Sequence, residues 1–156
     1  MTAAMKSIAR DECRDEIVRR LRLVRADSVR RWGTMTPHQM ICHCADACRM
    51  ASGEVAPADV GSVMTRSVVK WVALYAPMRW PSGIQTVPEF DQRTAGTPPE
   101  EFAADVATLE ALLGQIRRRD GGAPWPRHPI FGPMSQRAWL RWAYLHMDHH
   151  LRQFGA

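Results

Sequence analysis

The sequence SQRAWLRWAYLHMDHHLRQFG, residues 135–155, carries the signals of one complete helix. Ser135 is a residue type that caps helix N-termini, and Gly155 is a residue type that ends helices. At about 100° per residue, apolar and histidine side chains gather on one face and mainly charged side chains on the other. The first face is centred on His146 and holds Trp139, Trp142, Ala143, His150 and Gln153; the second holds Arg137, Arg141, Tyr144, Asp148 and Arg152. The pattern predicts an amphipathic helix that reaches Phe154 and turns its apolar face inward.

Start and stop signals of the same kind predict helices in the rest of the chain. Thr36 can cap a helix that has Pro37 at its first position and Gln39 at its third, which is a capping-box signature. Residues 97–100, Thr-Pro-Pro-Glu, repeat this logic. The predicted helices run from about Asp11 to Val24, from Pro37 to Ser52 before Gly53, from Met64 to Ala76 before Pro77, and from the signature at residues 97–100 to about Arg119 before Gly121-Gly122.

The connections and the size of the chain complete the fold prediction. Residues 78–96 include Pro81, Gly83 and Pro88, and residues 123–134 are rich in proline and aromatic residues, so two long irregular connections are expected. No run shows the sustained two-residue alternation of a half-buried strand. The chain has 156 residues, of which 46% are apolar, enough for one core without disulfides. We therefore expect a single all-α domain over residues 1–156, a four- or five-helix bundle.

Nothing in the sequence has the pattern of a secretory signal or a membrane span. The N-terminus is charged within its first ten residues and lacks an apolar stretch. The most apolar run, Val68 to Met78, is interrupted by Lys70 and is shorter than the roughly 20 residues that a bilayer requires. We expect a cytoplasmic protein with no membrane partner.

The positive charge gives little support to nucleic-acid binding. Lys and Arg number 21 against 16 Asp and Glu, for a net charge of +5. The basic residues are interspersed with acidic ones, and the compact cluster at residues 117–119 falls at a predicted helix end, where cations complement the helix dipole. No interleaved aromatic residues or nucleic-acid motif accompany the charge, so this class of partner is disfavoured.

Three histidines are predicted to point into the bundle from two helices. His146 and His150 lie one turn apart on the apolar face of the last helix, and His43 lies on the apolar face of the helix over residues 37–52. Three neutral imidazoles can bind one divalent metal ion, and Zn, Ni, Fe and Mn suit such ligands about equally. The alternative is that each histidine is a hydrogen-bonded core residue, because i,i+4 spacing also arises by chance.

Three further residues lie close to these histidines along the predicted helices. Asp46, one turn from His43, could accept the other N–H of that imidazole or could be a solvated acid. His149 lies about 60° from the centre of the apolar face and is expected at its rim or beside a ligand, rather than as a third ligand from this helix. His38, in the first turn of its helix, is expected at the surface.

The four cysteines are expected to be reduced thiols. Three of them fall within residues 42–48, too close to pair within one helix without strain. Cys42, His43 and Cys44 cannot converge on one ion, because adjacent helical residues point about 100° apart. Cys44 could approach a metal, but a buried cysteine that packs as a small apolar residue is the stronger interpretation.

Two stretches of the sequence resemble the DinB-like superfamily. One is WGTMTPHQMICH over residues 32–43, and the other combines HPIFG at residues 128–132 with YLHMDHHLRQFG at residues 144–155. The chain is most similar to an uncharacterised bacterial subgroup whose last helix ends in HxDHHLRQFG. The resemblance follows the order of elements over most of the chain, although its specific motifs make up about a quarter of it. It implies a four-helix bundle with a divalent metal on three histidines, which correspond to His43, His146 and His150.

The resemblance also implies an activity. The better-understood branches of the superfamily transfer or add a low-molecular-weight thiol such as bacillithiol or mycothiol. In this chain the metal's open position would bind a thiol cosubstrate as its thiolate, beside a small-molecule electrophile, in a transferase or a related hydrolase or isomerase. Trp139 and Trp142 could wall the pocket, and arginines at its mouth could meet an acidic cosubstrate. His128 is the candidate catalytic acid or base; a structural hydrogen bond is its alternative role.

Two further expectations concern the whole molecule. The alternative to an enzyme is a non-catalytic metal-binding or stress-response protein. A homodimer could form through Val68, Val69, Val72 and Tyr75, although burial in the core would explain these residues equally well.

Overall fold

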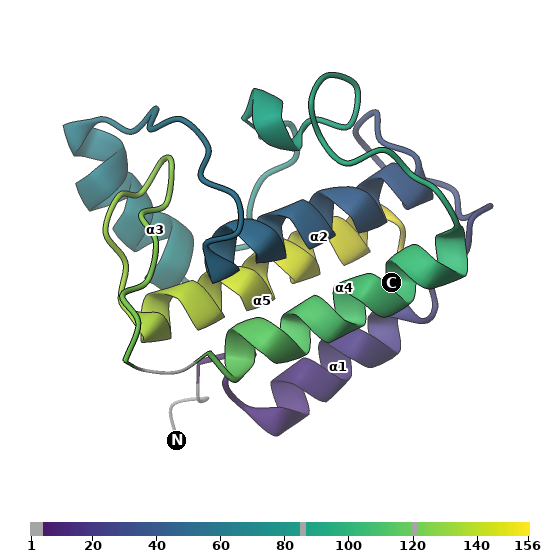
Figure 1. The fold of residues 1–156 in the computed structure, drawn as a ribbon, viewed down its shortest axis with the longest axis horizontal. Helices are drawn as coiled ribbons and strands as arrows, with labels where there is room; N and C mark the ends of the chain where they lie inside the picture. The colour runs from purple at the N-terminus through teal and green to yellow at the C-terminus, as the bar shows by residue number, and fades with distance from the viewer. Residues whose placement is uncertain (1–4, 85–86, 120–121) are drawn as a thin grey trace.

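A computed structural model describes residues 5–84, 87–119 and 122–156 of the chain (Figure 1). Within these residues it contains five α-helices and no β-strand, which confirms the all-α prediction. The helices are α1 (Asp11–Leu21), α2 (Pro37–Ser52), α3 (Lys70–Tyr75), α4 (Phe102–Arg117) and α5 (Gln136–Gln153), with a π-helical segment at Thr65–Val69 and a 3-10 turn at Pro88–Phe90.

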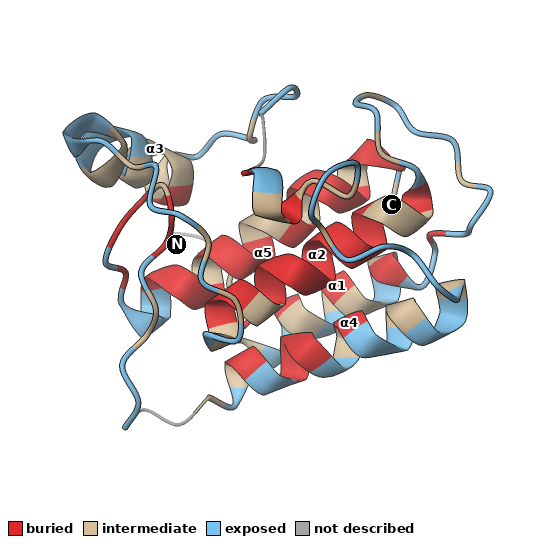
Figure 2. Ribbon diagram, turned by 45° about the horizontal axis from the view of Figure 1, so that its top comes forward, coloured by how far each residue is buried: buried red, intermediate tan, exposed pale blue. Residues whose placement is uncertain are grey.

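The four longer helices form the bundle, and α3 stands at one end of it (Figure 1). Helix α2 packs against both α4 and α5, and α1 packs against α5. The faces that these helices turn towards one another are buried (Figure 2). Trp139, Ile17, Leu109 and Met40 are among the fully buried side chains at the centre. Burial of this apolar area is the main force that holds α2 and α5 at a fixed distance and phase.

The predicted helix caps fix where the histidines lie along α2 and α5. The Thr36 hydroxyl accepts the Gln39 N–H at 3.1 Å, and the Gln39 side chain accepts the Thr36 N–H at 2.9 Å, so the capping box is confirmed. Gly53 ends α2 with a φ of 88°. Ser135 accepts the Ala138 N–H at 3.2 Å at the start of α5.

The prediction for the start of α4 is wrong, and the prolines explain why. A residue that precedes proline is disfavoured in the α conformation, so Pro98, which is followed by Pro99, is a poor first residue for a helix capped by Thr97. Glu101 caps it instead and accepts the backbone N–H groups of Ala103 and Ala104. The Thr97 hydroxyl donates to Asp46 at 2.6 Å.

Two other helix ends fall short of the predicted positions. Helix α1 ends at Leu21 rather than at Val24. Val24 lies in the turn after the helix but is still buried, so the apolar periodicity extends beyond the helix itself. Helix α4 ends at Arg117 rather than Arg119, and Gly121, the predicted stop, lies outside the described residues.

The helical segment that includes α3 turns much of its apolar surface to solvent. Val68 is 64% exposed and Trp71 is 61% exposed, whereas Val72 and Tyr75 are partly buried. Core burial therefore does not account for Val68.

In the described part of the chain, no helix is long and apolar enough to cross a membrane.

Candidate metal centre

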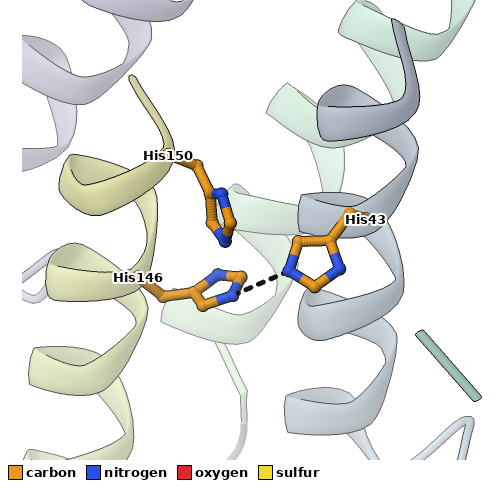
Figure 3. Close-up of side chains that lie close together, drawn as sticks. All are labelled: His43, His146 and His150. Carbon is orange, nitrogen blue, oxygen red and sulfur yellow. Dashed lines mark hydrogen bonds between the residues drawn. The ribbon is translucent and has the colours of Figure 1, made fainter. Parts of the chain in front are cut away.

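Three imidazoles from two helices converge at the interface of α2 and α5 (Figure 3). His43 comes from α2, and His146 and His150 come from successive turns of α5. The Nε2 atoms of His43 and His146 are 3.2 Å apart, and the ring of His150 lies with its centroid 4.6 Å from each of the other two. One ring nitrogen from each residue lies within 4.8 Å of the other two.

This spacing fits a divalent ion held by three nitrogens. At metal–nitrogen distances of about 2.0–2.1 Å, tetrahedral ligands are about 3.3 Å from one another. The pair of His43 and His146 already has this separation, and the ligand nitrogen of His150 lies within 4.8 Å of both. The predicted grouping of the three histidines is therefore present.

Burial keeps all three imidazoles neutral. Desolvation lowers the pKa of His43, and it lowers the pKa values of His146 and His150 well below the usual value. Repulsion among neighbouring imidazoles adds to this effect for His146 and His150. A neutral imidazole carries a lone pair on one ring nitrogen, so all three residues are in the protonation state that binds a metal at neutral pH.

In His43 and His150, a hydrogen bond made by Nδ1 decides which ring nitrogen carries that lone pair. His43 donates its Nδ1–H to the carbonyl of Phe90 at 2.9 Å. Gln153 donates an amide hydrogen to the carbonyl of Trp32 at 2.9 Å, which leaves its Oε1 to accept Nδ1–H from His150 at 3.2 Å. Both histidines consequently present Nε2 to the centre, as partners of this kind commonly arrange for metal-binding histidines.

Two tryptophan rings lie against His146, the third histidine of the group. The ring of Trp142 stacks on His146 with a centroid separation of 4.8 Å and an interplanar angle of 19°, and the edge of Trp80 approaches the same ring at 6.5 Å. Trp142 therefore does lie against the site as expected. Trp139 contacts Trp142 at 5.4 Å and lies one layer further from His146.

The family model for the protein of unknown function DUF1569 matches residues 7–156. The chain belongs to the DUF1569 family. That family is DinB/YfiT-like and uncharacterised, so it agrees with the resemblance seen in the sequence without assigning an activity. Comparisons with curated proteins and with solved structures gave no match.

Asp46 of this DUF1569 member does not hold the His43 ring, contrary to one of its two interpretations. It is 4% exposed, so the solvated alternative is wrong as well. Its carboxylate accepts hydrogen bonds from Arg49, Gln92 and Thr97. Asp46 thereby ties the irregular connection to α2, and that connection supplies the Phe90 carbonyl to His43.

The structure places His128 in a buried turn behind Trp142. Its Nδ1 accepts the backbone N–H groups of Ile130 and Phe131, both at 3.1 Å, which is the structural role that the sequence left open. The proton is therefore on Nε2, which is buried without a hydrogen-bond partner among the described residues. Desolvation lowers the pKa of His128 to about 3, so the ring is neutral at pH 7. The catalytic role stays a prediction.

The remaining residues near the site divide into confirmed and corrected predictions. Cys44 is fully buried, and desolvation raises the pKa of its thiol well above the usual value, in agreement with a small apolar role. All four cysteines are free thiols. His149 is 7% exposed, lies between Trp32 and Trp80 and has its ring centroid 5.0 Å from that of His150, so of its two expected positions it takes the one beside a ligand. His38 is only partly exposed and is bonded to Asp105, which corrects the surface assignment.

Proposed function

We propose that this chain is a divalent-metal-dependent enzyme that uses a low-molecular-weight thiol to attack a small electrophile. The observation that carries the proposal is the convergence of three neutral imidazoles, two of them held in the metal-binding tautomer by Phe90 and Gln153. Three protein ligands are typical of catalytic sites, which keep a further position for water or substrate.

The chain's own residues would hold and orient the reacting groups. His43, His146 and His150 would bind the ion, and a bound divalent ion lowers the pKa of a ligated thiol or water. Because the three imidazoles are neutral, the ion's charge would not be offset by the protein. Trp142 and Trp80 cover the His146 ring and would exclude bulk water from that side.

A pocket of about 340 Å³ beside Trp80 supports an anionic cosubstrate. Its lining includes Lys6, Arg79, Arg141 and Arg152, with Asp148 as the one acid. Arg152 pairs with Asp148 at 3.0 Å, whereas Arg79 has no side-chain partner within the described residues. The excess of cations would attract a thiol that carries carboxylates, and the Trp80 ring lies between this pocket and His146.

The first experiment is elemental analysis of the purified, untagged protein beside His146→Ala and His150→Ala. We expect near one equivalent of a first-row metal at the centre, lost in both variants while circular dichroism shows that each still folds. Metal-dependent turnover of thiols with electrophiles would then be screened. A wild-type protein that stays metal-free and resists reconstitution at neutral pH would overturn the proposal; metal binding without any turnover would favour a non-catalytic protein.

A further inference from the structure

A second group of metal-ligating side chains lies between α2 and α4. It consists of His38, Cys42 and Asp105, whose ligand atoms all lie within 4.8 Å of one another. His38 and Cys42 are one turn apart on α2, and Asp105 belongs to the first turn of α4. Three donors of different chemistry therefore meet where the two helices begin to pack.

The other two side chains of the group both contact one carboxylate oxygen of Asp105. Asp105 Oδ2 lies 2.6 Å from His38 Nε2 and 3.7 Å from Cys42 Sγ, and it also accepts the Glu100 N–H at 3.1 Å. The ring of Phe102 packs edge-on against His38 with a centroid separation of 5.3 Å, which helps to orient the imidazole. Cys42 is 2% exposed, while His38 and Asp105 keep partial access to solvent. One side of the group is thus fixed in the core and the other can adjust.

We infer that His38, Cys42 and Asp105 form a second divalent-metal site, distinct from the histidine centre and suited to Zn²⁺. Imidazole, thiolate and carboxylate together are borderline-soft ligands that Zn²⁺ prefers, whereas the harder Mg²⁺ and Ca²⁺ avoid thiolates. In a tetrahedral zinc site the nitrogen and oxygen ligands are about 3.3 Å apart and the sulfur and oxygen about 3.5 Å. The Cys42–Asp105 pair, at 3.7 Å, is already close to this separation, and the His38–Asp105 pair has to open by about 0.7 Å, which their partial exposure allows.

The two sites face different sides of α2. Cys42 and His43 are adjacent, and their side chains point about 100° apart around the helix axis. His43 faces α5 and Cys42 faces Asp105 on α4. Binding at the second site would release the thiol proton of Cys42 to solvent and move the His38 proton from Nε2 to Nδ1, so that the ion replaces the two hydrogens now shared with Asp105. The ion would clamp the start of α4 to α2.

Cobalt titration separates the two sites, because only the second contains a thiolate. Co²⁺ is added to the metal-free full-length protein under a phosphine reductant, and the thiolate-to-cobalt charge-transfer band is recorded together with the bound equivalents. We expect the band in the wild type and in His146→Ala, and its displacement by Zn²⁺. Cys42→Ala should lose the band and one equivalent, while the matched Cys48→Ala, which removes another buried thiol of α2, should keep both.

Two results would overturn the second site: a folded wild type without the band, or a band that survives Cys42→Ala. If Cys42→Ala does not fold, His38→Ala and Asp105→Asn decide the question. Each should weaken the affinity read from the band by at least about tenfold, and unchanged affinity in both would reject the site. Loss of metal at the histidine centre alone leaves the band in place, so the two proposals fail independently.

Discussion

Gln153 accepts the Nδ1 hydrogen of His150 at 3.2 Å while it donates to the backbone of residue 32 at 2.9 Å. The amide of Gln153 donates through its nitrogen and accepts through its oxygen. Its bond to the carbonyl of residue 32 therefore fixes the direction in which the oxygen points, which is towards His150. The end of α5 and the segment before α2 are thereby joined through the residue that orients the His150 ring.

Replacing Gln153 tests this arrangement. Gln153→Leu keeps the size of the side chain but removes both hydrogen bonds, so His150 loses the partner that selects its tautomer. We expect metal affinity to fall by roughly 10–100-fold, measured by competition with a chromogenic chelator. The matched variant Gln136→Leu, at an exposed position in the first turn of α5, should bind as the wild type does. Equal affinities for the two variants would contradict the role of Gln153.

Gly33 is expected to be required for the same contact. Its φ is 80°, and a Cβ at this position would clash with the Gln153 amide nitrogen. Gly83 has a φ of 82° but open space around it, so Gly33→Ala and Gly83→Ala share the backbone strain and differ in the clash. Each should lose about 1–2 kcal/mol in free energy of unfolding from strain. Only Gly33→Ala should lose more stability than this and also bind metal more weakly, as urea unfolding and metal competition would show.

Acid should destabilise the metal-free protein through His128. Its folded-state pKa of about 3 lies below the ordinary value of 6.5, so the neutral form is favoured in the folded protein. The stabilisation is present above pH 6.5 and is lost as pH falls towards 3, at up to about 1.4 kcal/mol per pH unit. His128→Asn can still accept the two backbone hydrogens but cannot be protonated. Its stability should decline less between pH 6.5 and 4; parallel profiles of thermal midpoint against pH would contradict this account.

The catalytic role predicted for His128 can be separated from its structural role by the same variant. If the imidazole takes part in proton transfer, His128→Asn should keep its metal and lose roughly 100-fold or more in kcat/KM. His128→Ala should in addition lose about 1–3 kcal/mol of stability, because two buried N–H groups lose their acceptor. Full activity in His128→Asn would leave the backbone hydrogen bonds as the residue's only function.

Self-association through the helical segment that includes α3 also remains a prediction. Val63, Met64, Val68 and Trp71 are each more than 60% exposed, an apolar surface that a second copy of the chain could cover. We expect sedimentation velocity to show a dimer, and Val68→Lys with Trp71→Lys to shift it to monomer without a change in circular dichroism. A wild-type monomer at all accessible concentrations would exclude this interface.

The grouping of the three histidines could be predicted from the sequence because helical phase is a local property. The caps at Thr36 and Ser135 set the helix starts, and from there the inward directions of His43, His146 and His150 follow by counting residues. The same wheel placed Tyr144 on the polar face, yet it is 3% exposed, because the packing of α1 against α5 covers that side.

The supporting contacts could not be predicted in this way. The partner of His43 is the backbone carbonyl of Phe90, and any residue type offers such a group. The pairing of His38 with Asp105 depends on the register of α4 against α2, which rests on contacts 67 residues apart in the chain. Gln153 is the exception: it lies on the histidine face three residues after His150, and that spacing was a usable signal.

The separation of the ligands along the chain also sets an order of assembly during synthesis. His43 and His146 are 103 residues apart, so at about 5–20 residues per second a ribosome needs roughly 5–20 s to complete the histidine centre after α2 has been made. Cys42 and Asp105 are only 63 residues apart. A nascent chain therefore displays the full set of donors at the α2–α4 junction well before α5 exists, and the two sites would acquire their ions in that sequence.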